Sequence, residues 1–336
     1  MRMIILTKKI EEGKGLYNML NRFDCIFASC ICLTKKDIVD NPQSYKDCEF
    51  IFSTWYMPEF TEEEITKYFP SLKAIFYAAG TVKYFAEPFL KKGVRVFTAA
   101  IANGIPVAEY AVSQIVLANK GFFQAQRAYN WPIWHRGFKK ARRYSELKFG
   151  NYGATVGIVG CGAIGSKVVE LLKPYNLRVY VYDPYLSEER AKSLNVKNVS
   201  LETVFSVCDV ISNHLPDIPE TRGLINYSLL SKMKRTATII NTGRGAQIEE
   251  KDLNKILRER KNMCALLDVT SHEPLLPCSP LYWRKNCFLT PHISGSLSHE
   301  TERMVEYMVQ AYRDTLEGKQ SPCETTLEII AKQSTH

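Results

Sequence analysis

Three apolar segments late in the chain are each followed by a side chain that could take part in acid–base chemistry: a cation at Arg244, a carboxylate at Glu273 and an imidazole at His292. When a hydride reaches a carbonyl carbon, the carbonyl oxygen becomes negative, and a protonated His292 can donate to it as a general acid. Glu273 can accept from the other imidazole nitrogen and fix the tautomer, while Arg244 can bind a carboxylate through two parallel hydrogen bonds. The set is suited to the reduction of a keto acid.

Taken singly, each of these residues has a more ordinary interpretation. An arginine after a strand is more often a surface ion-pair residue, a Glu-Pro step is usually a turn, and a histidine after proline is more often structural. His272 and His299 are alternative imidazoles, but His272 is adjacent to Glu273 in the chain and His299 is expected to lie in a helix. The hypothesis therefore depends on the three residues occurring together, downstream of a nucleotide-binding pattern.

The segments that precede these side chains are typical of buried strands in a parallel sheet. Four are predicted, over residues 210–213, 238–242, 264–269 and 287–290. Ligands bind at the carboxyl ends of the strands in a doubly wound α/β sheet. We therefore expect Arg244, Glu273 and His292 to meet at one edge of the sheet.

A glycine turn upstream has the spacing that a dinucleotide requires. The run over 155–165 predicts a strand, a turn with Gly160, Gly162 and Gly165 as G-x-G-x-x-G, and a helix. The first glycine permits the tight turn, the second lets the backbone approach a pyrophosphate, and the third allows the helix to pack closely on the strand. The pyrophosphate would bind the free N–H groups at the helix N-terminus.

The next predicted strand, 177–182, ends on Asp183, which lies 18 residues after Gly165. This carboxylate would accept hydrogen bonds from the adenosine ribose and would repel a 2′-phosphate, so the predicted cofactor is NAD rather than NADP. No cation follows before Arg190, which we interpret as a solvated helix residue.

The first hundred residues predict a second α/β unit. Strands are expected at 3–6, 50–53, 74–78 and 94–98, with helical stretches at 61–68 and 84–92. Pro106 is expected to begin a long helix, and residues 130–150 to form a connecting arm. Residues 297–316 are expected to form a final amphipathic helix before a frayed tail.

The composition is that of a globular chain with room for two domains: 336 residues, 46% hydrophobic and 24% charged. No apolar run approaches the ~20 residues that span a membrane, and no signal peptide is recognised, so a cytoplasmic protein is expected. The ten cysteines have no C-x-x-C spacing. Cys30 and Cys32 would share a strand face, but no metal site is predicted.

The net charge of +9 is spread along the chain, with one basic cluster at 139–143. No helix-turn-helix, zinc-finger or RNA-binding signature accompanies the charge, so nucleic acid is not expected as a partner. We interpret the cluster as a solvated connecting segment. The other interpretation is an electrostatic funnel for an anionic substrate or cofactor.

Together the motifs resemble the family of D-isomer-specific 2-hydroxyacid dehydrogenases, over nearly all of residues 50–315. The motifs that carry the resemblance are VGIVGCGAIG, NHLPDIPETRGLIN, IINTGRGAQIEEKDL, ALLDVTSHEP and FLTPHISGS. Position by position, it implies that Arg244, Glu273 and His292 are the catalytic residues of an NAD-dependent 2-keto acid reductase.

The resemblance also implies which residues bind cofactor and substrate. Beyond the three glycines and Asp183, the implied cofactor contacts are Ala163, Ile164, His214, Leu215, Pro216, Thr242, Gly243, Asp268 and Gly295. Asp268 would contact the nicotinamide carboxamide. The substrate carboxylate would be held by backbone amides of a loop in the first unit, and the substrate residues implied are Trp55, Ala79, Gly80, Thr81 and Asn103.

The implied architecture is two doubly wound parallel-sheet domains, Rossmann-like and flavodoxin-like, with a cleft between them. Residues 104–295 would form the NAD-binding domain, and residues 1–103 with 296–336 a discontinuous substrate domain. The usual assembly is a homodimer. The arm at 121–150 would cross to the partner, where Trp131, Trp134 or His135 would reach its cleft or pack in the interface.

Three departures from the family pattern bear on the substrate. Val82-Lys83 stands where the family often has Asp-Asn, Ser294 stands where the histidine motif usually has glycine, and residues 53–57 are bulky where the substrate side chain should lie. The pattern leaves open a small substrate, such as glyoxylate or hydroxypyruvate, and a larger one held by an aromatic wall. It also leaves open a non-catalytic NAD(H)-sensing interaction protein on the same fold.

Overall fold

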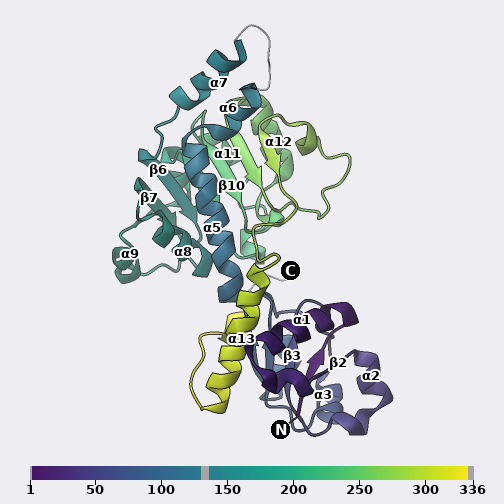
Figure 1. Ribbon diagram of the computed structural model, residues 1–336. Coiled ribbons are helices and arrows are strands. Elements are labelled where there is room, and N and C mark those ends of the chain that lie inside the picture. The colour runs from purple at the N-terminus through teal and green to yellow at the C-terminus, as the bar shows by residue number, and fades with distance from the viewer. Residues whose placement is uncertain (1, 130–135, 332–336) are drawn as a thin grey trace. The chain divides into compact units, whose positions relative to one another are not determined.

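The computed structural model describes residues 2–129 and 136–331, and the chain divides into two compact units. Unit 1 is Met1–Gly104 with Ser296–His336, and unit 2 is Ile105–Gly295. The boundary expected from the sequence lies one residue before this division. One helix, α5 (Ala100–Asn119), runs across the boundary (Figure 1).

Unit 1 is built on a six-stranded sheet in the order β13-β5-β4-β3-β1-β2, in which only β13 is antiparallel to its neighbour. Its strands are β1 (Arg2–Leu6), β2 (Ile31–Leu33), β3 (Cys48–Ser53), β4 (Ala74–Tyr77), β5 (Arg95–Thr98) and β13 (Glu324–Thr325). Its helices are α1 (Ile10–Phe23), α2 (Lys35–Asp40), α3 (Glu62–Tyr68), α4 (Ala86–Lys91), α13 (Glu300–Leu316) and α14 (Leu327–Ala331). The strands predicted at 3–6, 50–53, 74–78 and 94–98 are all present, but α1, β2 and α2 were not predicted.

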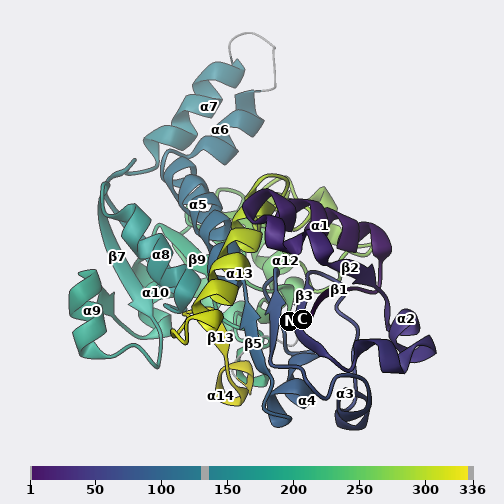
Figure 2. The ribbon, with the colours of Figure 1, turned by 60° about the horizontal axis from the view of Figure 1, so that its bottom comes forward.

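Local sequence explains how several of these helices begin, and long-range packing explains why the last one returns. Thr61 and Glu64 form a reciprocal capping box at the start of α3, as Thr34 and Asp37 do at α2. The buried face of α13 completes the core of unit 1, where the Tyr312 ring meets a set of phenylalanines from η1 (Cys25–Ser29) and the sheet: Phe27, Phe50, Phe52 and Phe76. The two segments of unit 1 therefore share one core, and α13 lies beside α1 (Figure 2).

Unit 2 is built on a seven-stranded sheet in the order β12-β11-β10-β9-β6-β7-β8, parallel throughout. Its strands are β6 (Tyr152–Val159), β7 (Asn176–Tyr182), β8 (Lys197–Asn198), β9 (Val210–Asn213), β10 (Thr238–Asn241), β11 (Cys264–Leu267) and β12 (Cys287–Leu289). Its helices, besides most of α5, are α6 (Phe122–Tyr129), α7 (Arg136–Glu146), α8 (Ala163–Leu172), α9 (Glu188–Leu194), α10 (Leu201–Val207), α11 (Tyr227–Lys232) and α12 (Glu250–Glu259).

Both faces of this second sheet are covered, which explains its almost continuously apolar strands. Buried side chains of α10, α11 and α12, such as Phe205, Leu229 and Leu253, pack on one face. Those of α5 and α8, such as Ile115 and Val168, pack on the other. Both units are thus doubly wound α/β structures, as predicted, and ligands are expected at the carboxyl ends of their strands.

Helix α5 differs from its prediction in two ways. It begins at Ala100 rather than Pro106, because Asn103 already bonds back to Ala99 and the proline is accommodated within the helix. It is also long and apolar enough, by length and composition alone, to cross a membrane, so the expectation that no run approaches that length was wrong. Its fully buried Ala111 and Ile115 pack on β6, which makes it a core helix of unit 2.

The described residues of the arm after α5 are mostly helical, in α6 and α7. The basic cluster at 139–143 lies on α7, and Gly121 permits α6 to turn against that helix: its φ is 66°, and a Cβ there would lie 2.7 Å from the Tyr144 oxygen. Figure 1 shows α6 and α7 side by side. The predictions for Trp131, Trp134 and His135, and for most of the tail, fall outside the described residues.

Candidate active site

In unit 2, the loops after three neighbouring strands carry the three side chains proposed for chemistry. Arg244 follows β10, Glu273 follows β11 and His292 follows β12. Because these strands pair in parallel and are adjacent in the sheet, their carboxyl ends lie next to one another. The strands predicted from the sequence therefore bring their loops to one edge.

His292 and Glu273 are in direct contact. Nδ1 of the imidazole lies 2.7 Å from Oε2 of the carboxylate. His292 has a φ of 54°, in the left-handed region that residues with a side chain seldom adopt and that is often found at functional sites. The two side chains are 46% and 41% exposed, so the pair adds little to folding stability.

Asp268 holds the loop that carries this imidazole. Its carboxylate is buried and accepts from the backbone N–H groups of Ile293 and Ser294, at 2.9 and 2.8 Å. It also accepts from the Thr290 hydroxyl at 2.7 Å. The Asp268 backbone oxygen accepts from the N–H of His292 at 2.9 Å. The loop conformation of His292 is thus fixed by four bonds to one residue.

Arg244 is positioned by three buried amide side chains, Asn213, Asn241 and Gln247. Nδ2 of Asn213 donates to Oδ1 of Asn241 at 2.9 Å, and also to Oε1 of Gln247. Nδ2 of Asn241 donates to the Arg244 backbone oxygen at 3.0 Å. The Arg244 N–H donates to Oε1 of Gln247, also at 3.0 Å. The backbone N–H and the backbone oxygen of Arg244 are therefore both held by buried amides.

The loops of Arg244 and Glu273 lie in close contact. A Cβ on Gly245 would lie 1.9 Å from the carbonyl carbon of Thr270, so only glycine fits there. Burial lowers the pKa of Arg244, while the negative charges of Glu273 and Asp217 raise it. The guanidinium therefore remains a cation, with a carboxylate of the candidate site in its electrostatic environment.

The glycine turn has the conformation that its sequence predicts. Gly160 has a φ of 91°, and a Cβ there would lie 2.9 Å from the backbone of His214. A Cβ on Gly165 would lie 2.0 Å from the Gly160 oxygen, whereas one on Gly162 would meet no atom within 4 Å. Gly162 is the N-cap of α8, so open space adjoins the first turn of that helix, where Ala163 and Ile164 lie.

Asp183, directly after β7, supports the glycine turn. Its Oδ2 accepts from the N–H of Cys161 at 2.7 Å, and its Oδ1 accepts from the N–H of Tyr185 at 2.8 Å. Arg190 is an exposed residue of α9, as predicted, and its guanidinium also donates to the Ser166 hydroxyl at 3.2 Å. Asp183 and Arg190 therefore both lie near the start of α8.

His214 follows β9 beside the glycine turn. Nε2 lies 2.9 Å from the Ser212 hydroxyl, and Nδ1 lies 3.4 Å from that of Thr242. Burial lowers the pKa of His214 to about 4, so the imidazole is neutral at ordinary pH. Thr242 and Leu215 are buried, and Pro216 is exposed.

In unit 1, the loop after β4 lies at the carboxyl edge of that sheet. The Ala79 oxygen accepts from the Ala99 N–H at 3.0 Å, but the N–H groups of Gly80 and Thr81 donate to no atom of the described residues. Asn103 lies near this loop, since a Cβ on Gly80 would be 3.6 Å from its Nδ2. Two backbone amides thus lie unpaired beside an amide side chain.

The loop after β3 carries the exposed aromatic residues of unit 1. Trp55 and Tyr56 are 40% and 42% exposed, and Tyr56 has a φ of 72°. The ammonium of Lys9, from the loop after β1, lies 3.7 Å from the centre of the Tyr56 ring. Because β1 and β3 are neighbours, these groups share the sheet edge with the β4 loop.

Residues 112–294 match the model of the D-isomer specific 2-hydroxyacid dehydrogenase family, NAD binding domain. The chain belongs to this family. It is therefore an NAD-dependent oxidoreductase of the class that acts on 2-hydroxy acids. A glyoxylate reductase of Korarchaeum cryptofilum is 30% identical over 97% of this chain and 96% of its own length.

Other members match over a part of their length or in fold. A D-3-phosphoglycerate dehydrogenase of Archaeoglobus fulgidus is 34% identical over 61% of this chain, which covers 38% of that enzyme. The NAD-complexed D-isomer specific 2-hydroxyacid dehydrogenase of Lactobacillus delbrueckii ssp. bulgaricus has a TM-score of 0.75 over 97% of this chain and all of its own, at 19% identity. The two-sheet architecture is thus that of the family.

The residues of unit 2 fit the family's cofactor, NAD. Gly162 leaves open space at the N-terminus of α8, where backbone N–H groups and the helix dipole attract a pyrophosphate. Within the described residues, no group of three or more His, Cys, Asp or Glu side chains is arranged to hold a metal ion.

A cavity of about 410 Å³ adjoins the imidazole–carboxylate pair in unit 2. Asp268, Glu273 and His292 line it, together with Leu275 of the loop after β11 and Leu289 at the end of β12. Arg244 is not among its lining residues.

Sequence reasoning assigned no role to the amide side chains that hold Arg244 in place. The amides Asn213, Asn241 and Gln247 lie inside the quoted motifs, and two of them are polar residues that end apolar strands. A polar amide at the end of an otherwise apolar strand is the sequence feature that could have indicated a structural role. Nothing local indicated that Tyr110 of α5 would bond the Thr290 hydroxyl at 2.9 Å, because the two residues are 180 positions apart.

Proposed function

We propose that this dehydrogenase reduces a small 2-keto acid to the D-2-hydroxy acid, with His292 as the general acid and, in the reverse direction, the base. The observation that carries the proposal is the 2.7 Å contact between Nδ1 of His292 and Glu273. A carboxylate on Nδ1 fixes the orientation of the ring and leaves Nε2 for the proton transfer. NADH supplies the hydride when it is bound.

Arg244 has the second role in this proposal. Its charged, planar guanidinium can bind the substrate carboxylate while it polarises the keto oxygen, a geometry that lysine does not offer. Negative charge grows on that oxygen as the reaction proceeds, so a preorganised cation stabilises the transition state more than the ground state. The buried amides around the Arg244 backbone keep the loop in one conformation before substrate arrives.

For the substrate, we propose a small keto acid such as glyoxylate or hydroxypyruvate. The unpaired N–H groups of Gly80 and Thr81 are suited to a carboxylate. The bulky Trp55 and Tyr56 at the same edge of unit 1 leave less room for a long side chain. Two relatives named glyoxylate reductase, 30% and 34% identical, support the same choice.

A panel of 2-keto acids assayed with NADH tests this function. We expect glyoxylate and hydroxypyruvate to be reduced with a higher kcat/KM than phenylpyruvate or 2-ketohexanoate. A preference for phenylpyruvate would contradict the small-substrate proposal but not the reaction. Tight NADH binding with no oxidation by any keto acid would overturn the enzymatic proposal and favour the NAD(H)-sensing protein.

We also propose that the protein is a homodimer that associates through unit 2. Large apolar side chains are exposed on and beside the arm: Phe122 is 44% exposed, Phe149 70% and Tyr152 78%. Sedimentation of Phe149→Ser and Tyr152→Ser tests this, and we expect each to weaken dimerisation about tenfold. Tyr185→Ser, at an 89% exposed tyrosine outside the arm, is the matched control.

A further inference from the structure

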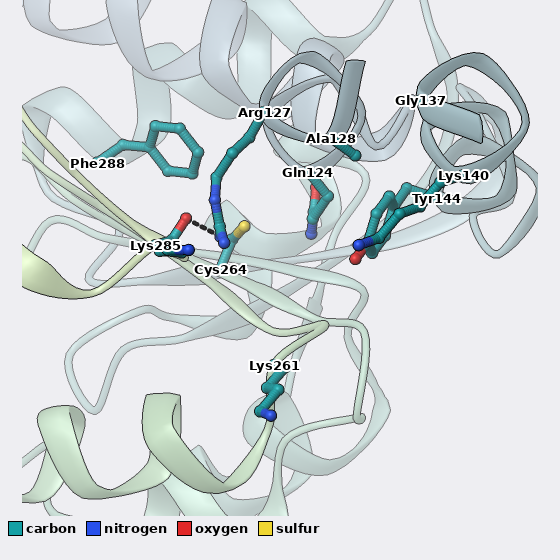
Figure 3. A pocket seen from close by; sticks show the side chains of 10 residues that line it. All are labelled: Gln124, Arg127, Ala128, Gly137, Lys140, Tyr144, Lys261, Cys264, Lys285 and Phe288. Atoms are coloured by element: carbon teal, nitrogen blue, oxygen red, sulfur yellow. Dashed lines mark hydrogen bonds between the residues drawn. The ribbon is translucent and has the colours of Figure 1, made fainter. Parts of the chain in front are cut away.

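A second and larger cavity lies at the opposite edge of the unit 2 sheet. Its volume is about 570 Å³, and its walls come from α6, α7 and the amino ends of β11 and β12 (Figure 3). Cys264, the first residue of β11, and Phe288 of β12 line its floor. In a parallel sheet the amino ends lie opposite the edge with His292, so this cavity is separate from the candidate active site.

The wall formed by α6 is fixed by three contacts, one to strand β12 and two to the loops that precede β11 and β12. Nε2 of Gln124 donates to the Asn262 oxygen at 3.2 Å, and Arg127 donates to the backbone oxygen of Lys285 (Figure 3). The rings of Phe123 and Phe288 lie 5.3 Å apart. One wall of the cavity is therefore a helix that is held in place.

The lining is strongly cationic. Arg127, Lys140, Lys261 and Lys285 line the cavity, and no acidic residue does. None of the four forms an ion pair with a carboxylate of the residues that the structure describes. Like charges gathered without a counter-charge repel one another, and a bound anion would relieve that repulsion.

Two cations at or near the cavity are partly removed from water. Burial lowers the pKa of Arg127, and it lowers that of the nearby Lys148 to about 8. Burial also raises the pKa of the Cys264 thiol on the cavity floor to about 12, so this thiol is neutral at ordinary pH. Lys140, one member of the basic cluster at 139–143, lines the cavity.

We propose that this cavity binds a phosphorylated small molecule. A phosphate monoester carries close to two negative charges and three acceptor oxygens, which suits a guanidinium flanked by ammonium groups better than a single carboxylate does. The rings of Tyr144 and Phe288 offer apolar contact to the rest of the molecule. A sugar phosphate and a nucleotide share this chemistry, and the experiment separates them.

The test is a binding titration of the full chain saturated with NADH, so that the glycine turn of unit 2 is already occupied. Inorganic phosphate, ribose 5-phosphate, AMP and uncharged ribose are added at constant ionic strength, and binding is followed by calorimetry and by the melting temperature. We expect saturable binding and a rise in Tm with the three phosphates and neither with ribose. Tighter binding of AMP than of ribose 5-phosphate identifies a nucleotide, and the reverse order a sugar phosphate.

The variant Lys140→Gln/Lys285→Gln locates the site. Loss of two charge-assisted contacts should weaken phosphate binding by about a hundredfold. Lys139→Gln, an exposed neighbour on α7 that does not line the cavity, is the matched control and should bind as the parent does. The proposal is overturned if no phosphate binds, if sodium chloride reproduces the rise in Tm, or if the double variant binds as the control does. A cavity filled by a second copy of the chain would give the first of these outcomes.

Discussion

The backbone of Gly245 lies against the carbonyl group of Thr270, with room for a hydrogen atom and nothing larger. A Cβ on Gly245 would lie 1.9 Å from the Thr270 carbonyl carbon and 2.1 Å from its oxygen. Gly245 follows Arg244 directly, and Thr270 begins the turn that leads to Glu273, whose Oε1 accepts from the Thr270 N–H at 3.3 Å. This contact therefore sets the spacing between the guanidinium and the carboxylate.

Replacing Gly245 with alanine should separate the two loops. Because the obstacle is backbone, the overlap cannot be relieved by a side-chain rotation, and we expect a loss of about 1–3 kcal/mol in stability with a fall of about a hundredfold in kcat/KM. Urea unfolding and steady-state kinetics measure the two effects. Gly15→Ala is the control: an added Cβ there meets nothing within 4 Å on an exposed part of α1, and the variant should be as active as the parent.

His292→Asn should remove the proton donor and leave cofactor binding intact. We expect turnover to fall by about 10²–10⁴-fold, the usual contribution of a general acid, with an unchanged dissociation constant for NADH by fluorescence titration. His272→Asn changes an exposed imidazole in the same region and should retain activity. Near-normal turnover of His292→Asn would show that another group supplies the proton.

Asp183→Asn should weaken the discrimination between NADH and NADPH. The uncharged amide no longer repels a 2′-phosphate, so the ratio of kcat/KM values should shift towards NADPH by about tenfold or more. Because Oδ2 also accepts from the Cys161 N–H, affinity for both cofactors should fall as the turn loosens. Glu188→Gln, an exposed acid at the start of α9, is the control. An unchanged ratio would contradict the ribose role.

Stability should fall as the pH is lowered through the range in which His214 titrates. The unfolded chain takes up a proton near the ordinary histidine pKa of 6.5, but the folded chain does so only at about pH 4. Between these values acid favours the unfolded state, by up to about 3 kcal/mol, and less where solvent reaches the half-buried ring. Urea unfolding at several pH values measures this, and His214→Gln should flatten the slope. Equal slopes for both proteins would refute the assignment.

The strands, the glycine turn and the adjacency of the three reactive loops could be predicted from the sequence because each depends on a short local pattern. Apolar runs such as 264–267 are buried on both faces and are therefore easy to recognise. Parallel pairing then puts their carboxyl ends together without further information. The open space at Gly162 and the positive φ of Gly160 follow from the same kind of pattern.

The parts that escaped prediction depend on contacts between distant positions. The left-handed conformation of His292 is held by Asp268, 24 positions earlier, and no feature of the sequence around His292 indicates it. The start of α5 before Pro106 and the helical form of 136–146 were missed because proline and a basic run are weak local signals that packing overrides. The cavity beside the arm could not be predicted either, because its lining combines the amino ends of two strands with both arm helices.

The side chain of Asn103, just before the chain leaves unit 1, accepts a hydrogen bond at 2.9 Å from Ser296, where the chain returns. Unit 2 is thus inserted at one point in the chain of unit 1, and unit 1 completes its own core with α13. Insertion at a point where both ends already meet leaves each part free to fold by itself. Removal of unit 2 would leave the two cut ends of unit 1 side by side, so a short linker from residue 104 to residue 296 could rejoin the chain around the core that α13 completes.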